Sequence, residues 1–215
     1  MASILSIHAS PHGAASRGAT LALQAVANLQ AADPSLALVE RDLSALSLAN
    51  IPQAYSEAVL AQQPDDHAAF ALSETLISEV EDAAFITIAT PMHNYTVPAC
   101  LKLWIDLVLR HRRSFASANG VKTGLLGDRP VLVVVTAGGL VTGPGAVQPN
   151  HLAGYLTDVL ATVGISDVRF VYLEGLVNPV QADIAMAQGI RMISEDPAFG
   201  SRQGNPPAMA RAVNR

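Results

Sequence analysis

The chain has 215 residues, of which half are apolar and 14% are charged, with a formal net charge of −5. This length favours one domain, and the acidic balance argues against nucleic acid or an anionic membrane as a main partner. No apolar run reaches the roughly 18 residues that a membrane span needs. The only cysteine, Cys100, cannot form an internal disulfide, and the start of the chain lacks the basic region of a signal peptide. We therefore expect a cytoplasmic protein.

Apolar runs alternate with helical patterns along most of the chain, which is typical of repeated βα units. The predicted strands cover residues 3–8, 36–42, 84–89, 130–136 and 168–173. The predicted helices cover residues 17–31, 53–62, 67–82, 99–113, 150–163 and 182–194. Short links and right-handed crossovers then predict an α/β fold with a doubly wound, five-stranded parallel sheet. Because the first loop lacks G-x-G-x-x-G, we favour the flavodoxin-like strand order 2-1-3-4-5 over a dinucleotide-binding order.

We expect one domain over residues 1–195, followed by a tail over residues 196–215. The tail is polar and rich in proline and glycine, so we predict that it is mobile. The segment over residues 43–66 is irregular apart from its predicted helix, and we interpret it as an excursion within the domain. The basic run over residues 110–113 is expected to interact with the dipole at the end of its helix. The six histidines show no metal-ligand spacing, so we predict no metal site.

The most informative stretch, residues 89–98, joins a buried strand to an amphipathic helix. Ligands of parallel α/β sheets bind at this end of the strands. Pro91 and Pro98 restrict the backbone on either side of the loop, and we count Pro91 as part of the candidate site. Between the prolines lie four side chains that suit a flat aromatic ligand, namely Met92, His93, Asn94 and Tyr95. An ordinary strand-to-helix turn is the alternative.

The loop over residues 9–18 joins the first strand to a helix N-terminus. Free N–H groups and the helix dipole favour anions there. The candidate anion ligands are Ser10, Ser16, Arg17 and Gly18. No Walker lysine follows, so a monophosphate fits better than a triphosphate. The alternative is that Ser16 only caps the helix.

A third turn follows the fourth predicted strand and consists of Thr136, Ala137, Gly138 and Gly139. Adjacent glycines let a backbone approach a ligand closely, although a plain tight turn would need them too. In the order 2-1-3-4-5 the first, third and fourth strands are neighbours, so the three loops meet at one edge of the sheet. A phosphate at the first loop and a ring system at the other two predict one FMN site.

Together the three loops resemble those of the FMN-dependent NADH azoreductase family, relatives of the flavodoxin-like quinone reductases. The resemblance covers about residues 3–194. It depends on S-x5-S in the first loop, P-M-H-N-Y-T-V-P-x-x-L-K-x-W-I-D in the second and T-A-G-G in the third. It implies that the first loop binds the FMN phosphate. It also implies that the second loop lies along the isoalloxazine and that the third meets the polar edge of that ring.

Three positions depart from the family pattern. The family usually has tyrosine where this chain has His93, and a second hydroxyl is common where Gly18 stands. An arginine or similar residue is often found where this chain has Ala137, so a side-chain donor to the pyrimidine edge of the flavin is missing there. We expect these departures to alter the flavin potential or the range of substrates.

We find no Ser-His-Asp set or acid/base pair, as expected where a cofactor carries the chemistry. The resemblance implies that NADH or NADPH reduces FMN and that a quinone or azo compound then takes two electrons in a ping-pong reaction. His93 is the candidate catalytic side chain, as a proton donor. The resemblance also implies a homodimer, which the apolar surface all round the 99–113 helix favours. The alternatives are a non-catalytic FMN-binding or sensor module that acts through its dimer surface, and a one-electron carrier.

Overall fold

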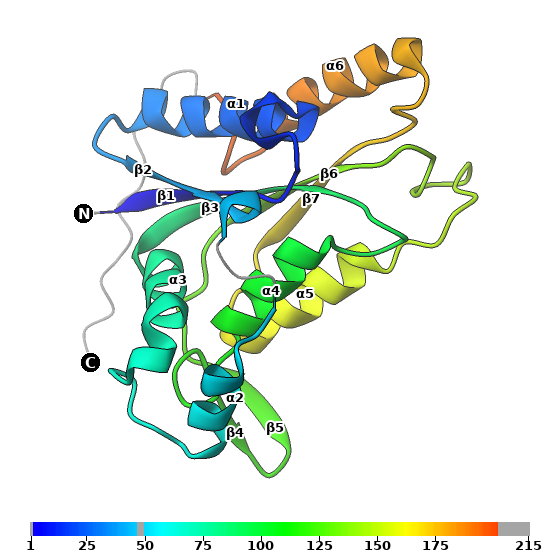
Figure 1. The fold of residues 1–215 in the computed structure, drawn as a ribbon. Helices are drawn as coiled ribbons and strands as arrows, with labels where there is room; N and C mark the ends of the chain where they lie inside the picture. Colours follow the sequence, from blue (N-terminus) through cyan, green and yellow to red (C-terminus); the bar gives the residue numbers. More distant parts are fainter. Residues whose placement is uncertain (1, 47–49, 202–215) are drawn as a thin grey trace.

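The computed structural model describes residues 2–46 and 50–201 and contains one parallel sheet between two layers of helices (Figure 1). The five strands of this sheet have the order β2-β1-β3-β6-β7. Their bounds are Ser3–His8 for β1, Ala37–Asp42 for β2, Ala83–Pro91 for β3, Val131–Thr136 for β6 and Val168–Leu173 for β7. The predicted flavodoxin-like order 2-1-3-4-5 is therefore confirmed, with β6 and β7 as the fourth and fifth main strands.

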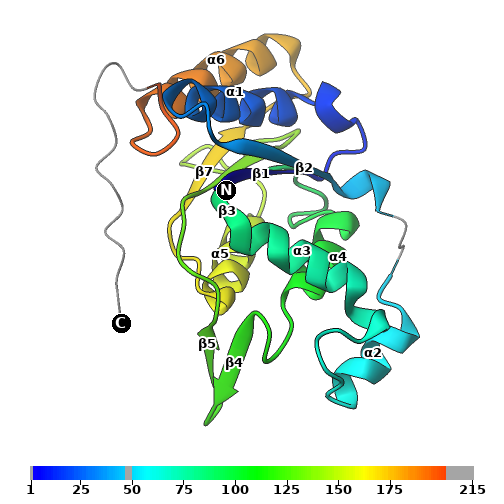
Figure 2. The same ribbon diagram turned by 90° about the vertical axis from the view of Figure 1, so that its left-hand side faces the viewer.

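The helices divide between the two faces of the sheet (Figures 1 and 2). One face is covered by α1 (Arg17–Ala32) and α6 (Pro179–Glu195), and the other by α3 (Ala71–Asp82), α4 (Ala99–Val108) and α5 (Leu152–Val163). The short helix α2 (Gln53–Leu60) lies in the excursion between β2 and α3. Covering on both faces explains why β6 is a continuous run of β-branched and leucine residues. Its alternate side chains enter the two separate hydrophobic clusters on either side of the sheet.

The residues at two helix ends follow the usual capping preferences. The Asn178 side chain accepts hydrogen bonds from the first turn of α6, and Pro179 is the first residue of that helix, as expected at a helix start. Gly164 ends α5 with a φ of +105°, a left-handed conformation that favours glycine. A β carbon on Gly164 would lie 2.3 Å from the carbonyl oxygen of Leu126. The end of α5 is therefore packed backbone to backbone against the segment that precedes β6.

The predicted helix over residues 99–113 is wrong beyond Val108, where α4 ends. The buried hydroxyl of Ser114 donates a hydrogen bond to the Val108 carbonyl and accepts one from the Arg110 N–H. This contact turns the chain away from the helix axis. A hairpin of β4 (Phe115–Ala118) and β5 (Val121–Gly124) follows, and Figure 2 shows it projecting beyond the helices. No strand is predicted from the sequence between residues 113 and 130, so this hairpin was missed.

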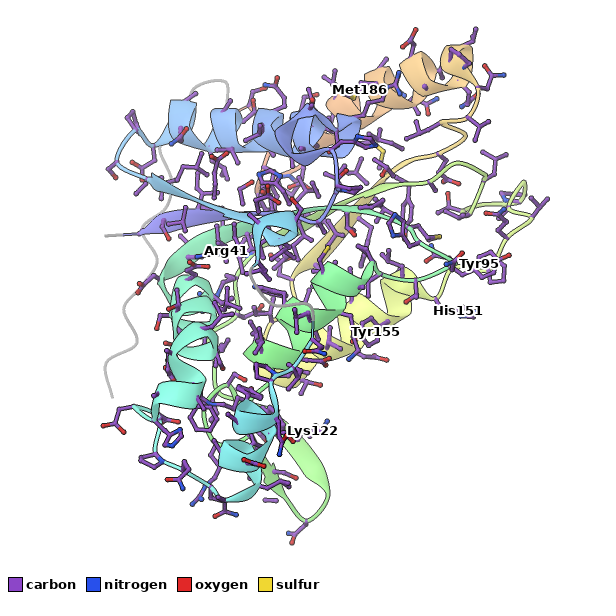
Figure 3. The ribbon with its side chains drawn as sticks, in the orientation of Figure 1. Arg41, Tyr95, Lys122, His151, Tyr155 and Met186 are labelled. Carbon is purple, nitrogen blue, oxygen red and sulfur yellow. The ribbon has the colours of Figure 1, made fainter. Side chains whose placement is uncertain are left out.

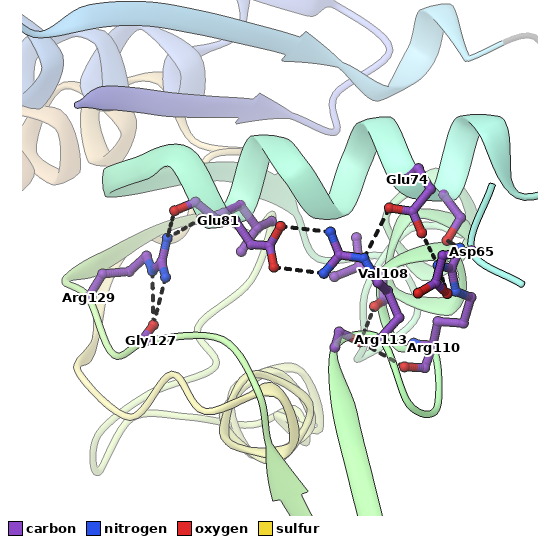
Figure 4. A network of polar contacts seen from close by, with 11 residues as sticks. Asp65, Glu74, Glu81, Val108, Arg110, Arg113, Gly127 and Arg129 are labelled. Atoms are coloured by element: carbon purple, nitrogen blue, oxygen red, sulfur yellow. Dashed lines mark hydrogen bonds and ion pairs between the residues drawn. The ribbon is translucent and has the colours of Figure 1, made fainter. Parts of the chain in front are cut away.

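Two of the basic residues after α4, Arg110 and Arg113, pair with carboxylates and lie beyond the end of the helix (Figure 4). Arg110 is buried, and its guanidinium donates to Asp65 at 2.8 Å and also to Glu74. Arg113 donates to Glu74 at 3.0 Å and to both oxygens of Glu81 at 2.7 Å. The interaction predicted with the helix dipole is therefore wrong. These arginines attach the start of the hairpin to α3.

Arg129 caps the C-terminal end of α3 (Figure 4). Its guanidinium donates to the carbonyl oxygens of Glu81 and Ala83 at 2.9 and 2.8 Å, and to that of Val80. The last carbonyls of a helix have no partner within the helix, so this side chain satisfies them. Strand β3 begins at Ala83, directly after α3 ends at Asp82, and the junction needs no intervening loop.

The apolar side chains of α4 are covered within the chain itself. Leu101, Trp104 and Ile105 are each at most 2% exposed, and the outward face carries Lys102 paired with Asp106. The predicted surplus of apolar surface on this helix is therefore wrong, and α4 gives no support to a homodimer. Within the described residues, no helix is long and apolar enough to cross a membrane, and no group of His, Cys, Asp and Glu side chains could hold a metal ion.

A buried polar line runs beneath α1. Thr87 Oγ1 donates to Ser6 Oγ at 3.0 Å, and Ser6 Oγ lies 3.2 Å from His8 Nε2. Burial lowers the pKa of His8 below its ordinary value, and the carboxylates of Glu40 and Asp42 oppose that shift. The neutral imidazole is therefore the form that the fold favours.

The chain stays packed after α6. Phe199 is fully buried, its ring lies 5.9 Å from that of Phe85, and its carbonyl accepts a hydrogen bond from Asn28. A domain limit after residue 195 stays a prediction, but the described chain contacts the domain as far as Phe199. Most of the predicted mobile tail, residues 202–215, lies outside the described residues.

Candidate functional site

The first loop leaves β1 and forms the N-terminus of α1. Ser10 is only 7% exposed, and its hydroxyl accepts a hydrogen bond from the His12 N–H at 3.2 Å. The Ser16 hydroxyl accepts from the Ala19 N–H at 3.1 Å, which is the N-cap arrangement. Among the described residues, the N–H groups of Arg17 and Gly18 have no hydrogen-bond acceptor. Two free donors at a helix N-terminus, with an exposed arginine, form a suitable anion site.

Gly18 also has a packing role, which the sequence alone does not indicate. A β carbon at this position would lie 3.1 Å from Thr136 Cγ2 and 3.9 Å from the Ala89 side chain. The start of α1 therefore lies close against β3 and β6. The structure places the N–H of Gly18 at the helix start, whereas its α carbon faces the sheet.

The second loop begins where β3 pairs with β6 through Pro91 and Thr136. The Met92 N–H then donates to the Thr136 carbonyl at 2.8 Å. His93 and Thr96 exchange backbone hydrogen bonds of 2.9 and 3.1 Å. These backbone hydrogen bonds therefore fix the conformation of the loop together with the two prolines.

The two residues inside that pair complete a tight turn. Asn94 and Tyr95 have φ values of +47° and +73°, as in a two-residue turn of type I′. The Tyr95 carbonyl accepts a hydrogen bond from the N–H of His151, just before α5. Figure 3 shows Tyr95 and His151 at the same end of the sheet. The turn presents Tyr95, which is 44% exposed, at the carboxyl edge.

The third turn is fastened to the loop that follows β7. The Ala137 N–H donates to the Leu173 carbonyl at 2.9 Å, and the Leu176 N–H donates to the Ala137 carbonyl at 3.2 Å. The Gly175 N–H donates to the Gly139 carbonyl at 3.3 Å. These bonds leave Gly138 exposed at the edge of the sheet.

The three loops line two hollows at the carboxyl edge. The first hollow has a volume of 620 Å³ and is lined by Ser10, Pro11, His12, Ala15, Ser16, Arg17, Pro91, His93, Thr136 and Leu176. The second has a volume of 200 Å³ and is lined by Met92, Asn94, Tyr95, Ala137, Gly138 and Gln148. Neighbouring residues of the same two segments line both hollows, so the hollows adjoin. Eleven of the thirteen predicted site residues therefore share this edge, while Gly18 and Gly139 lie beside it.

Five further residues line the hollows without having been predicted as site residues. The first hollow includes Pro11, His12, Ala15 and Leu176, and the second includes Gln148. The sequence offered a signal only for Pro11, His12 and Ala15, which lie within the first loop. Leu176 and Gln148 come from loops in which the sequence contains no recognisable motif.

The chain belongs to the family described as having a flavodoxin-like fold, whose model matches residues 2–195. It is 50% identical over 189 residues to "FMN-dependent NADH:quinone oxidoreductase 5" of Burkholderia lata, a match that covers 88% of this chain and 92% of that protein. It is 49% identical over 177 residues to "FMN-dependent NADH:quinone oxidoreductase 4" of Pseudomonas fluorescens, covering 82% and 86%.

Solved structures show the same fold. An azoreductase from Bacillus anthracis superposes with a TM-score of 0.76 at 21% identity, covering 89% of this chain and 96% of that one. An FMN-dependent NADH-azoreductase from the same species, solved in complex with FMN, gives a TM-score of 0.72 at 19% identity, covering 89% and 97%.

Proposed function

We propose that this protein is an FMN-dependent oxidoreductase that uses NADH or NADPH to reduce quinones and azo compounds. The observation that carries this proposal is the convergence of three loops on two adjoining hollows at one edge of the sheet. The relatives that are about 50% identical over most of their length are named FMN-dependent NADH:quinone oxidoreductases. The azo substrates are suggested by the structural neighbours named azoreductases.

The residues of the first hollow fit the phosphate of FMN. Two N–H groups, those of Arg17 and Gly18, lack acceptors among the described residues. The hydroxyls of Ser10 and Ser16 and the Arg17 guanidinium add donors. Charge-assisted bonds of this kind are stronger than neutral ones. No ammonium side chain of the Walker type is needed for a monophosphate.

The residues of the second hollow fit the ring of the flavin. Met92 and Tyr95 offer apolar surface, while Asn94 and the Gly138 backbone offer polar groups. When bound, FMN would supply the hydride chemistry, which protein side chains do not carry out themselves. The rigid turn over residues 93–96 would hold the ring in place for both substrates.

His93 is the side chain that we assign to proton transfer. It is exposed and lines the first hollow beside Pro91 and Thr136. An imidazole ring carries an N–H donor, so His93 would give a proton to an acceptor that has taken electrons. Asn94 and Gly138 would orient the ring and leave the exposed side open to the two substrates in turn.

The assembly and location are also proposals. We propose a homodimer, supported by the exposed apolar side chains of Leu60 on α2, Val121 on β5 and Leu125 directly after β5. We propose a cytoplasmic location and one FMN-binding domain over residues 1–195. Sedimentation of the purified protein at several concentrations tests the dimer, which a monomer at all concentrations would exclude.

The test of function is reconstitution with FMN followed by anaerobic mixing with NADH and then with a quinone. We expect one FMN per chain, bleaching of the flavin absorbance by NADH and its return on adding quinone. Arg17→Ala should weaken FMN binding, whereas Arg191→Ala, which removes an exposed arginine from α6, should not. A purified protein that takes up no FMN would refute the proposal. FMN binding without NADH oxidation would favour the non-catalytic module instead.

A further inference from the structure

The loop after the glycine turn folds back on itself. The Val147 N–H donates to the Leu140 carbonyl at 3.3 Å, and the Ala146 N–H donates to the Gly143 carbonyl at 3.1 Å. This closure returns Gln148 to the side of Gly139. The loop therefore brings a long polar side chain back to the edge of the sheet.

Gln148 lies directly against Gly139. A β carbon on residue 139 would lie 3.1 Å from Gln148 Oε1 and 3.4 Å from Gln148 Nε2. A β carbon at this position would therefore push the carboxamide of Gln148 aside by a few tenths of an ångström. The second glycine of the turn thus makes room for Gln148 as well as shaping the turn.

Glu174, just after β7, holds the base of this loop. Its carboxylate accepts hydrogen bonds from the Thr142 N–H at 3.0 Å, from the Val141 N–H and from the Thr142 hydroxyl. Bonds to an ionised acceptor are stronger than neutral ones. Glu174 therefore anchors the start of the loop, and the bond between Val147 and Leu140 closes its end next to Gln148, whose side chain is exposed.

Gln148 shares the second hollow with Asn94, Ala137 and Gly138. The methyl group of Ala137 cannot form hydrogen bonds, although this position adjoins the expected polar edge of the flavin. A carboxamide carries two donor hydrogens and an acceptor oxygen. The pyrimidine edge of a flavin likewise carries carbonyl acceptors and a ring N–H donor, so the two groups are complementary.

We infer that Gln148 is a cofactor-contacting residue that hydrogen-bonds the pyrimidine edge of FMN in place of the side chain that Ala137 lacks. This inference depends on the proposed function. A carboxamide is neutral, whereas a guanidinium is charged, so Gln148 supplies donor contact without adding positive charge at the ring. The reduced, more electron-rich ring accepts hydrogen bonds more strongly, so this donor favours reduction of the flavin.

The test measures the FMN dissociation constant by fluorescence quenching and the two-electron midpoint potential against reference dyes. Gln148→Ala should raise the dissociation constant about five- to tenfold, as expected for one lost hydrogen bond. It should also make the potential more negative, and a tenfold loss of preference for the reduced ring equals about 30 mV. Gln148→Glu keeps the shape but replaces the donor by a carboxylate, so both changes should be larger.

Two controls separate this role from a general effect on the loop. Gln188→Ala removes the same side chain from the exposed face of α6 and should change neither quantity. Gly139→Ala should displace Gln148 and reproduce the effect of Gln148→Ala, with no further loss when the two changes are combined. This variant also tests the inference if Gln148→Ala folds poorly, which circular dichroism would show.

The outcomes distinguish the inference from the function. Wild-type dissociation constant and potential in both Gln148 variants would overturn the role of Gln148 and leave the FMN site standing. A wild-type protein that binds no FMN would overturn both.

Discussion

Gly18 offers a test of how tightly the phosphate end of the site is packed. Its missing β carbon would lie 3.1 Å from Thr136 Cγ2, about 0.5 Å inside an ordinary carbon–carbon contact. The perturbation is Gly18→Ala, made in the wild type and in a Thr136→Ser background. The serine keeps the hydroxyl and removes the methyl group that the new side chain would meet.

The magnitude follows from two opposing effects. Alanine restricts the unfolded chain and favours helix, which stabilises by about 0.4–1 kcal/mol. Overpacking costs about 1–3 kcal/mol, and Thr136 is half-buried, so we expect the lower part of this range. We therefore expect Gly18→Ala to destabilise the wild type by about 1 kcal/mol and to stabilise the Thr136→Ser protein by about 0.5 kcal/mol. The coupling free energy is about 1.5 kcal/mol, within the range for residues in contact.

Urea unfolding of the four apoproteins, followed by circular dichroism, measures this coupling. Equal effects of Gly18→Ala in the two backgrounds would show that Thr136 rotates away or that α1 shifts at no cost. Either result would refute the claim that the start of α1 is fixed by this contact.

Three further predictions concern stability. Arg110→Ala should lower the free energy of unfolding by about 2–4 kcal/mol, because it removes a buried guanidinium and leaves Asp65 and Glu74 without this partner. The exposed Arg112→Ala should cost less than about 0.5 kcal/mol in the same urea titration. Because burial lowers the pKa of His8, its contribution is fully present above about pH 6.5 and is lost as the pH falls below that value. In His8→Gln the stability should be less pH-dependent between pH 5 and 7.5, and an unchanged slope would contradict this assignment. Gly164→Ala should lower the melting temperature far more than Gly143→Ala. Both glycines have a positive φ, but a β carbon on Gly164 would also clash with backbone atoms, whereas one on Gly143 would meet open space. Similar losses in the two variants would show that backbone strain alone matters.

The main sheet could be predicted because its strands are apolar runs covered on both faces. The predicted limits of the first and fifth strands coincide with those of β1 and β7. The end of α4 could not be predicted, because it depends on Ser114 and on the pairing of Arg110 with Glu74, which is 36 residues away in sequence. Local helix propensity does not depend on contacts between residues so far apart in the sequence.

The hairpin is a different case, since a signal was present. Asn119-Gly120 joins β4 to β5 with φ values of +53° and +79°, and this dipeptide is a strong indicator of a two-residue turn. Its flanking strands are short and only weakly apolar, so the turn signal was the single clue. The Asn119-Gly120 dipeptide is therefore sufficient to predict the hairpin.

The candidate site was predictable where it depends on strand ends. Parallel strands place the loops of β1, β3 and β6 at one edge, so their residues meet whatever the loop details. Gln148 was not predictable, since its position depends on Glu174 from a different loop. The sequence shows the loop as a run of glycine and proline without indicating how it closes.

The turn at Asn94 and Tyr95 also limits how this protein could acquire new substrates. Both residues have left-handed backbone conformations, which few side chains tolerate, so random changes there would often spoil the turn. Met92 and His93 have no such restriction and line the two hollows. Directed evolution toward other electron acceptors should therefore begin at these two positions.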